Sequence, residues 1–215
     1  MAPAQREIVS SLMKVHGRTY SSELGIRLDR NTPAPLFQLL CAALLFSTRI
    51  SADAAASAAK ALYDKGWTTP RKLSDSTWRE RTDVLNRAGY ARYDESTSRM
   101  LGETADLLQE RYKGDLRRLR EESGRDPGKE RERLQEFKGI GDNGADIFCR
   151  EVQLQWPELY PFVDQKARKG AKGLELNPDP TVLKNMVRRS DFPKLVAALV
   201  RVQLAGNFEE ILNQA

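Results

Sequence analysis

The sequence contains few of the residues that build metal sites, disulfide frameworks and histidine-dependent catalytic centres. Only two cysteines, Cys41 and Cys149, and a single histidine, His16, occur among its 215 residues. Two widely spaced cysteines match no zinc or iron–sulfur pattern, and both lie in apolar stretches, so we expect reduced core thiols. One histidine cannot form a His-cluster metal site and disfavours a Ser-His-Asp triad, so we expect no metal chemistry of this kind.

Long hydrophobic runs are also missing. The longest, residues 36–46, is interrupted by Gln38 and is too short to span a bilayer. The N-terminus has no apolar run of the kind that a signal peptide needs. We therefore expect a soluble, cytoplasmic protein with no membrane partner.

Charge of either sign is only modestly in excess. The chain has 35 Lys and Arg against 30 Asp and Glu, a net charge of +5. Most of the excess lies in residues 164–189, where seven basic residues face three acidic ones. A phosphate backbone would select such a basic patch, but a solvated surface loop can have the same composition.

The apolar periodicity is helical almost throughout, and strand-type alternation is nearly absent. We expect a first helix marked by Ile8, Leu12 and Val15, and a centrally buried helix over residues 36–46. Further helices are expected over residues 51–63 with Ser51 as cap, 77–87 ending at Gly89, 96–112, 131–137, 142–154 and 192–204. The sequence thus predicts an all-α fold.

A two-glycine turn between residues 137 and 142 is the most informative window. Gly139 and Gly141 permit positive φ and a close approach of the backbone to a ligand. Ile140 between them can fill the space between the flanking helices. The helix that follows has free N–H groups and a dipole that favour an anion such as a DNA phosphate. A helical hairpin without a ligand would show the same local pattern.

The wider pattern resembles a known family. Leu134-x-x-Phe137-x-Gly139-Ile140-Gly141-x-x-x-Ala145 is similar to the helix-hairpin-helix motif of the endonuclease III-like DNA glycosylase superfamily. Val163-Asp164 follows at the superfamily's usual spacing. Residues 35–48 resemble its early buried helix, and residues 85–92 resemble its Gly-hydrophobic-Tyr-Asn segment. The similarity covers about residues 33–170.

The resemblance implies an all-α, two-domain helical bundle with a central cleft. We expect a six-helix barrel with the hairpin over residues 34–150, and a second helical domain from residues 1–33 and 151–215. Double-stranded DNA would bind across the cleft, and a monomer would flip a damaged nucleotide into it. In a bacterium the protein would associate with the nucleoid.

The same resemblance assigns catalysis to Asp164. Its carboxylate would stabilise the oxocarbenium-like transition state of N-glycosidic bond cleavage and orient a water molecule; the alternative is that Asp164 only caps the following helix. Asn143 replaces the lysine with which bifunctional members form a Schiff base, so the resemblance implies a monofunctional glycosylase. Lys138 and Lys166 do not match that position. Lys166 also replaces the histidine of the family's Asp-x-His, which leaves a non-catalytic relative open.

The DNA contacts implied by the resemblance begin with the hairpin residues Gly139, Ile140, Gly141, Asn143 and Gly144. Tyr90 would be a wedge in the base stack, or simply a core residue. Thr48 and Arg49 would line the pocket or the opposite side of the gap, or Arg49 would be an ordinary surface cation.

No cofactor is expected, because the family's iron–sulfur cluster needs four cysteines near the C-terminus and none follows Cys149. Lys166, Arg168 and Lys169 would take over its DNA contact. The hairpin carbonyls could hold a monovalent cation, as the resemblance suggests.

Ala43 stands where adenine-excising relatives have a glutamate that acts as general acid. Without that acid, a base that already carries positive charge is the best leaving group, so we expect an alkylated purine, with a mismatched or oxidised pyrimidine as the next choice. The expected function is a base excision repair DNA glycosylase. A DNA-binding protein that has the fold without catalysis, and a helical protein–protein adaptor, are the alternatives.

Overall fold

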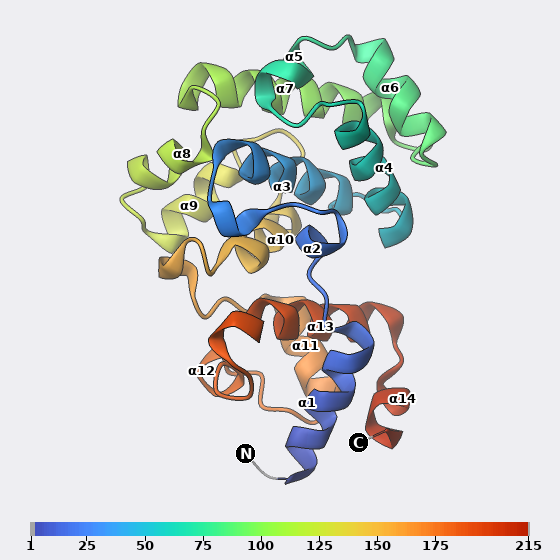
Figure 1. Cartoon of the computed structure of the whole chain (residues 1–215), viewed down its shortest axis with the longest axis vertical. Helices are drawn as coiled ribbons and strands as arrows, with labels where there is room; N and C mark the ends of the chain where they lie inside the picture. Colours follow the sequence, from blue (N-terminus) through green and yellow to red (C-terminus); the bar gives the residue numbers. More distant parts are fainter. Residues whose placement is uncertain (1–2, 215) are drawn as a thin grey trace. The chain divides into compact units, whose positions relative to one another are not determined.

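The structure, a computed structural model that describes residues 3–214, is helical and contains no strand over that range. The all-α prediction is confirmed (Figure 1). The elements, with η for 3-10 helices, are α1 (Pro3–His16), α2 (Tyr20–Glu23), η1 (Leu28–Arg30), α3 (Pro33–Phe46), α4 (Ala52–Asp64), α5 (Pro70–Ser74), α6 (Trp78–Arg87), α7 (Asp94–Tyr112), α8 (Leu116–Glu122), α9 (Pro127–Leu134), α10 (Asp142–Val152), η2 (Pro157–Leu159), α11 (Gln165–Gly173), α12 (Pro180–Leu183), η3 (Arg189–Asp191), α13 (Phe192–Ala205) and α14 (Phe208–Asn213).

The chain forms two compact units, and each is described by itself. Unit 1 comprises Met1–Glu23 and Cys149–Ala215, and unit 2 comprises Leu24–Phe148. Residues 24–33, which the sequence analysis placed with the N-terminal part of the second domain, fall in unit 2. Their apolar side chains Leu24, Ile26 and Leu28 are buried, and η1 contacts α3. This segment therefore belongs to unit 2, because its apolar side chains are buried there.

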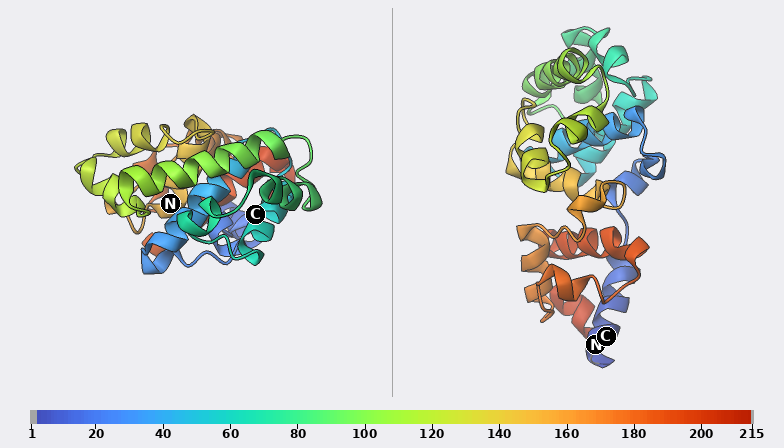
Figure 2. Two further views of the ribbon diagram at one scale, coloured as in Figure 1. Left: turned by 90° about the horizontal axis from the view of Figure 1, so that it is seen from above. Right: turned by 90° about the vertical axis from the view of Figure 1, so that its left-hand side faces the viewer.

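Unit 2 is organised around α3, which runs through its middle (Figure 1). The helix begins at Pro33 rather than at residue 36, because proline is tolerated in the first turn of a helix, where no intrahelical N–H bond is lost. Every residue from Leu36 to Leu45 except Gln38 is buried, as predicted for a central helix. The long α7 lies along α5 and α6 (Figure 2).

Local capping signals begin α4 and α6 where the sequence predicted, whereas the helix predicted over residues 131–137 is wrong in its bounds: α9 spans Pro127–Leu134 because Asp126 caps it. Ser51 accepts a hydrogen bond from the Ala54 N–H at 3.2 Å and starts α4. Thr77 and Glu80 form a reciprocal capping box at the start of α6. Gly89 follows α6 with φ of 84°, a left-handed conformation that glycine adopts without strain.

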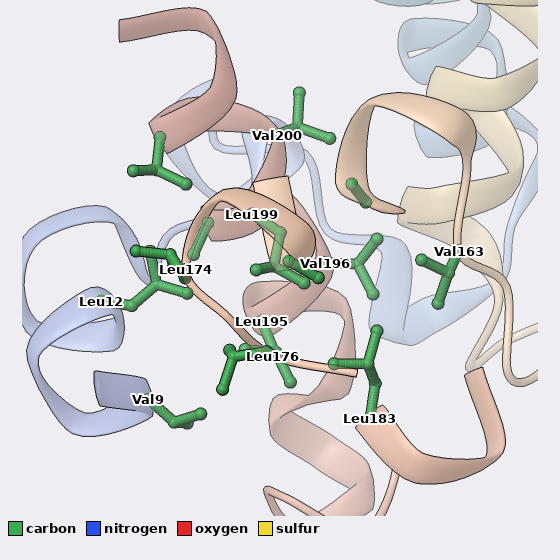
Figure 3. Close-up of a cluster of buried hydrophobic side chains, with 14 of the residues drawn as sticks. Val9, Leu12, Val163, Leu174, Leu176, Leu183, Leu195, Val196, Leu199 and Val200 are labelled. Carbon is green, nitrogen blue, oxygen red and sulfur yellow. The ribbon is translucent and has the colours of Figure 1, made fainter. Parts of the chain in front are cut away.

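Unit 1 buries an apolar core between α1, α11 and α13 (Figure 3). Val9 and Leu12 of α1 belong to the same buried cluster as Leu195 and Leu199 of α13, and the two helices are in contact. Both ends of the described chain contribute to this core, since α1 supplies Val9 and α14 supplies Ile211, and the Ser11 hydroxyl of α1 also donates to the carbonyl of residue 214 at 2.9 Å.

The crossing of α11 and α13 in this core is very close. A Cβ on Gly170 would lie 2.0 Å from the carbonyl oxygen of Leu199. Glycine at this position is therefore required by packing, because any side chain would separate the two helices.

Candidate functional site

The hairpin turn joins α9 to α10 within unit 2. Gly139 has φ of 88°, and a Cβ there would lie 2.7 Å from the Met100 sulfur. Ile140 is 3% exposed, so its side chain fills the space inside the turn, as predicted. Gly141 is exposed, and a Cβ on it would meet nothing within 4 Å. Folding thus requires glycine at position 139 but imposes no such requirement at position 141.

Gly144, which was predicted to contact DNA, is a packing residue in this structure. It is buried, and a Cβ there would lie 2.7 Å from the Ser47 hydroxyl and 3.2 Å from Ile140 Cδ1. The close approach of α10 to the end of α3 explains the glycine by packing, and the contact of Gly144 with DNA stays a prediction.

The outer side of the hairpin carries acidic residues that are neutralised internally. Arg131 of α9 forms ion pairs with Asp142 and Asp146 of α10, both at 3.0 Å. The Gln135 amide also donates to Asp142 at 3.0 Å. Burial tends to lower the pKa of Arg131, but its hydrogen bonds and charge contacts to the two carboxylates outweigh this and raise it. Arg131 thus joins the two hairpin helices and offsets negative charge beside the turn.

Asn143 lies half-buried in the first turn of α10, one residue after Asp142. Its amide nitrogen is not nucleophilic, so this position has no group that could form a Schiff base.

Tyr90, proposed as a wedge for the base stack, is a core residue. Its side chain is fully buried, its hydroxyl donates to the Leu45 carbonyl at 3.0 Å, and it hydrogen-bonds the Thr48 hydroxyl. Burial raises the pKa of this phenol, against a hydrogen bond from Thr48 that acts to lower it. An insertion role would require Tyr90 to leave this site, so the core-packing alternative is correct.

Thr48 and Arg49 follow the C-terminal end of α3. Thr48 is half-buried, with its hydroxyl 3.0 Å from the Leu45 carbonyl and beside the Tyr90 hydroxyl, while Arg49 is exposed. Thr48 therefore completes the end of the buried helix, and Arg49 is available to a ligand.

Asp164 lies in unit 1 at the N-cap of α11. Its Oδ1 accepts hydrogen bonds from the N–H groups of Lys166 at 2.8 Å and Ala167 at 3.0 Å. Its Oδ2 forms an ion pair with Arg150, and the two side chains are only 2% and 3% exposed, respectively. Asp164 thus caps α11 and has in addition a buried cationic partner, while its catalytic role stays a prediction.

Arg150 is a site residue that sequence reasoning missed. It follows Ile147, Phe148 and Cys149 on α10, and a charge in such an apolar stretch requires a partner if it is buried. That signal was readable from the sequence, but the identity of the partner was not.

Two neighbours of Arg150 also hold polar contacts in unit 1. Gln153 is fully buried; its amide oxygen accepts the Phe162 N–H at 2.9 Å, and its amide nitrogen donates to the Phe162 carbonyl at 3.3 Å. Glu151 accepts hydrogen bonds from the N–H groups of Tyr20 and Ser21. The last turns of α10 therefore fix both the start of α2 and the loop that leads to Asp164.

The backbone arrangement is similar to two solved structures of endonuclease III bound to DNA. One is a trapped covalent intermediate, an estranged-adenine complex, with a TM-score of 0.54 and 16% identity. The other is a non-covalent complex, with a TM-score of 0.55 and 16% identity. In both cases the similarity covers 94% of this chain and 86% of the other. The chain has the endonuclease III fold. No protein-family model and no curated protein matches it.

The basic residues predicted to contact DNA differ in availability. In this chain, Lys166 and Lys169 of α11 are exposed. Arg168 is half-buried, and its guanidinium donates to the carbonyls of Val163 at 3.2 Å and Pro178 at 3.4 Å. Arg168 therefore braces two loops, and its predicted role as a phosphate ligand is not supported.

The residues present do not fit the iron–sulfur cluster associated with the endonuclease III fold. The sequence has two cysteines, both buried, where a cluster would need four thiolates. Within residues 3–214, no group of His, Cys, Asp and Glu side chains is arranged to hold a metal ion. Over the same residues, no helix combines the length and apolar character needed to cross a bilayer.

Proposed function

We propose that this chain is a monofunctional DNA glycosylase of base excision repair. The hairpin carries the proposal: its exposed Gly141, immediately before α10, has no packing reason to be glycine. A bare backbone at the start of an 11-residue helix allows a phosphate to approach the first N–H groups. The endonuclease III fold, whose two solved neighbours hold DNA, supports the same ligand.

The proposed reaction is hydrolysis of the N-glycosidic bond. The bond between C1′ and the base breaks, the base departs with the electron pair, and positive charge develops on the sugar. The oxygen of water then bonds to C1′ and loses a proton, leaving an abasic site. Asp164 would stabilise the sugar cation by its charge.

An alkylated purine is the proposed substrate. Ala43 is fully buried in α3 and has no group that could protonate a departing base. The ion pair with Arg150 offsets part of the negative charge that Asp164 offers to the sugar cation. A base that already carries positive charge can leave without being protonated by an acid. Its removal therefore needs neither a general acid at position 43 nor a fully charged carboxylate at position 164.

Gly141→Ala tests DNA binding separately from folding. Because the added methyl group meets no protein atom, we expect the melting temperature to stay unchanged while affinity for duplex DNA falls at least fivefold. Gly128→Ala on α9 is the control, because Gly128 is also exposed and without positive φ and its Cβ would meet only the Asp126 carboxylate at 3.2 Å; it should leave affinity unchanged. Equal affinities of the two variants for duplex DNA would show that the hairpin does not contact DNA.

Catalysis is tested with duplex oligonucleotides that each contain one damaged base. Wild type and Asp164→Asn are incubated with each duplex, and half of each sample is treated with hot alkali before a denaturing gel. We expect breaks at alkylated purines only after alkali, and none with the variant. Breaks without alkali would show a lyase, and release of another base would replace the proposed substrate.

A second candidate, a DNA-binding protein without catalysis, is favoured by the Arg150–Asp164 ion pair. A carboxylate held by two helix N–H groups and a buried guanidinium has a complete structural role. Salt-sensitive DNA binding by wild type together with no base release from any duplex would establish this candidate.

A further inference from the structure

Arg189 of unit 1 forms a cation–π contact with an aromatic ring. The carbon at the centre of its guanidinium is 4.2 Å from the centroid of the Tyr160 ring. Tyr160 is itself half-buried and meets Phe192 edge-on, with 5.2 Å between ring centroids. A guanidinium held over a ring that itself packs against Phe192 has fewer orientations to lose on binding, and its planar set of N–H donors suits bidentate recognition of a phosphate.

The charge of Arg189 has no acidic partner among residues 3–214. The nearest acid in sequence, Asp191, pairs instead with Lys194 at 2.8 Å. Two other arginines of unit 1 have acidic partners, since Arg150 pairs with Asp164 and Arg201 pairs with Glu23. Arg189 is therefore an exposed cation that contacts the Tyr160 ring and has no acidic partner among the described residues. Its charge is available to bind an anion.

The stack is tied to the loop that leads to Asp164. Tyr160 precedes Asp164 by four residues, and Gln153 holds the backbone of Phe162 between them from both sides. An anion bound at Arg189 would thus be held by the same short segment that positions the carboxylate.

We propose that Arg189 binds a phosphodiester of the DNA backbone and that Tyr160 orients it for this contact. The proposal rests on the proposed DNA-binding function and fills the place that the sequence assigned to Arg168, whose guanidinium is engaged by two carbonyls. Removing one cation–phosphate interaction from a protein–DNA complex lowers the salt dependence of binding by about one unit of slope.

The neighbouring Arg188 is a matched control. It is also exposed, lies directly before Arg189, and makes no stacking contact with a ring among the described residues. Affinities of wild type, Arg188→Ala and Arg189→Ala for a labelled duplex would be measured by fluorescence anisotropy over a salt series. We expect Arg189→Ala to lose about tenfold in affinity and about one unit of salt slope, and Arg188→Ala to lose less than twofold.

The role of the ring is tested with Tyr160. Tyr160→Phe keeps the stack and should bind as wild type does, whereas Tyr160→Leu should lose about threefold to fivefold with an unchanged salt slope, since the charge remains. Arg189→Lys, which keeps the charge but not the planar fork, should fall between wild type and Arg189→Ala. Melting curves verify that every variant compared is folded.

The outcomes separate this inference from the function on which it rests. If wild type shows no salt-sensitive DNA binding, the proposed function itself fails. If wild type binds DNA and Arg188→Ala loses as much as Arg189→Ala, the patch is only a diffuse cation surface and the inference is wrong. Equal binding by Tyr160→Leu and wild type would overturn the orienting role of the ring.

Discussion

Replacing Arg150 with methionine should destabilise unit 1 strongly. The substitution leaves the Asp164 carboxylate, 2% exposed, without its cationic partner. Breaking a buried ion pair from one side costs about 3–5 kcal/mol. Because Asp164 keeps two helix N–H donors, we expect the lower end, about 3 kcal/mol, or roughly a hundredfold in the unfolding equilibrium constant.

The second substitution, Asp164→Asn, should rescue the first. Asparagine removes the unpaired charge and is as good a helix cap as aspartate. We expect Arg150→Met/Asp164→Asn to lie within about 1 kcal/mol of wild type, although the Arg150→Met change alone costs more. Rescue of this sign is specific to a buried charge, because two independent losses of packing would add.

Urea unfolding followed by tryptophan fluorescence measures this cycle. Trp156 is fully buried in unit 1, whereas Trp67 and Trp78 lie in unit 2. In a background in which Trp67 and Trp78 are phenylalanine, the signal therefore reports on unit 1 alone. A cost below about 1 kcal/mol for Arg150→Met, or a double variant as unstable as that single one, would refute the reasoning.

Three further outcomes follow from the packing. Gly170→Ala should destabilise unit 1 by about 3 kcal/mol in urea unfolding, because its methyl group would collide with the Leu199 carbonyl, whereas alanine at an exposed position of α11 should cost little. Gly139→Ala should cost about 1 kcal/mol more than Gly66→Ala by thermal melting, since both have positive φ but only the first would strike a neighbour. Cys41 is buried and burial raises its thiol pKa, so its labelling by a disulfide reagent should follow unfolding; fast labelling in buffer would contradict the core placement.

Features that depend on neighbouring residues were predictable from the sequence. The Ser51 and Thr77 caps and the hairpin glycines act within four residues of themselves, so their patterns specify local conformation. The apolar run of α3 predicted a central helix, because a helix with apolar residues on nearly all sides has no polar face to expose to solvent. The resemblance to endonuclease III-like proteins predicted the fold, because the motifs that carry it are short patterns that can be recognised in the sequence itself.

Features that join distant segments required the tertiary structure. The residues around Tyr90 in the sequence do not predict that its hydroxyl will hydrogen-bond Leu45 and Thr48. Likewise, the residues around Arg168 do not predict its hydrogen bond to the carbonyl of Pro178. The role of Asp164 likewise depends on Arg150, which lies one helix away.

The sequence by itself determined the helical class, the hairpin and the candidate carboxylate. Only the tertiary structure decided which of the candidate side chains are engaged inside the protein and which, like Arg189, face outward with an uncompensated charge. The physical reason is that burial and pairing of a polar group are set by the segments that fold against it, and the free energy of such a group depends on those contacts rather than on its sequence neighbours.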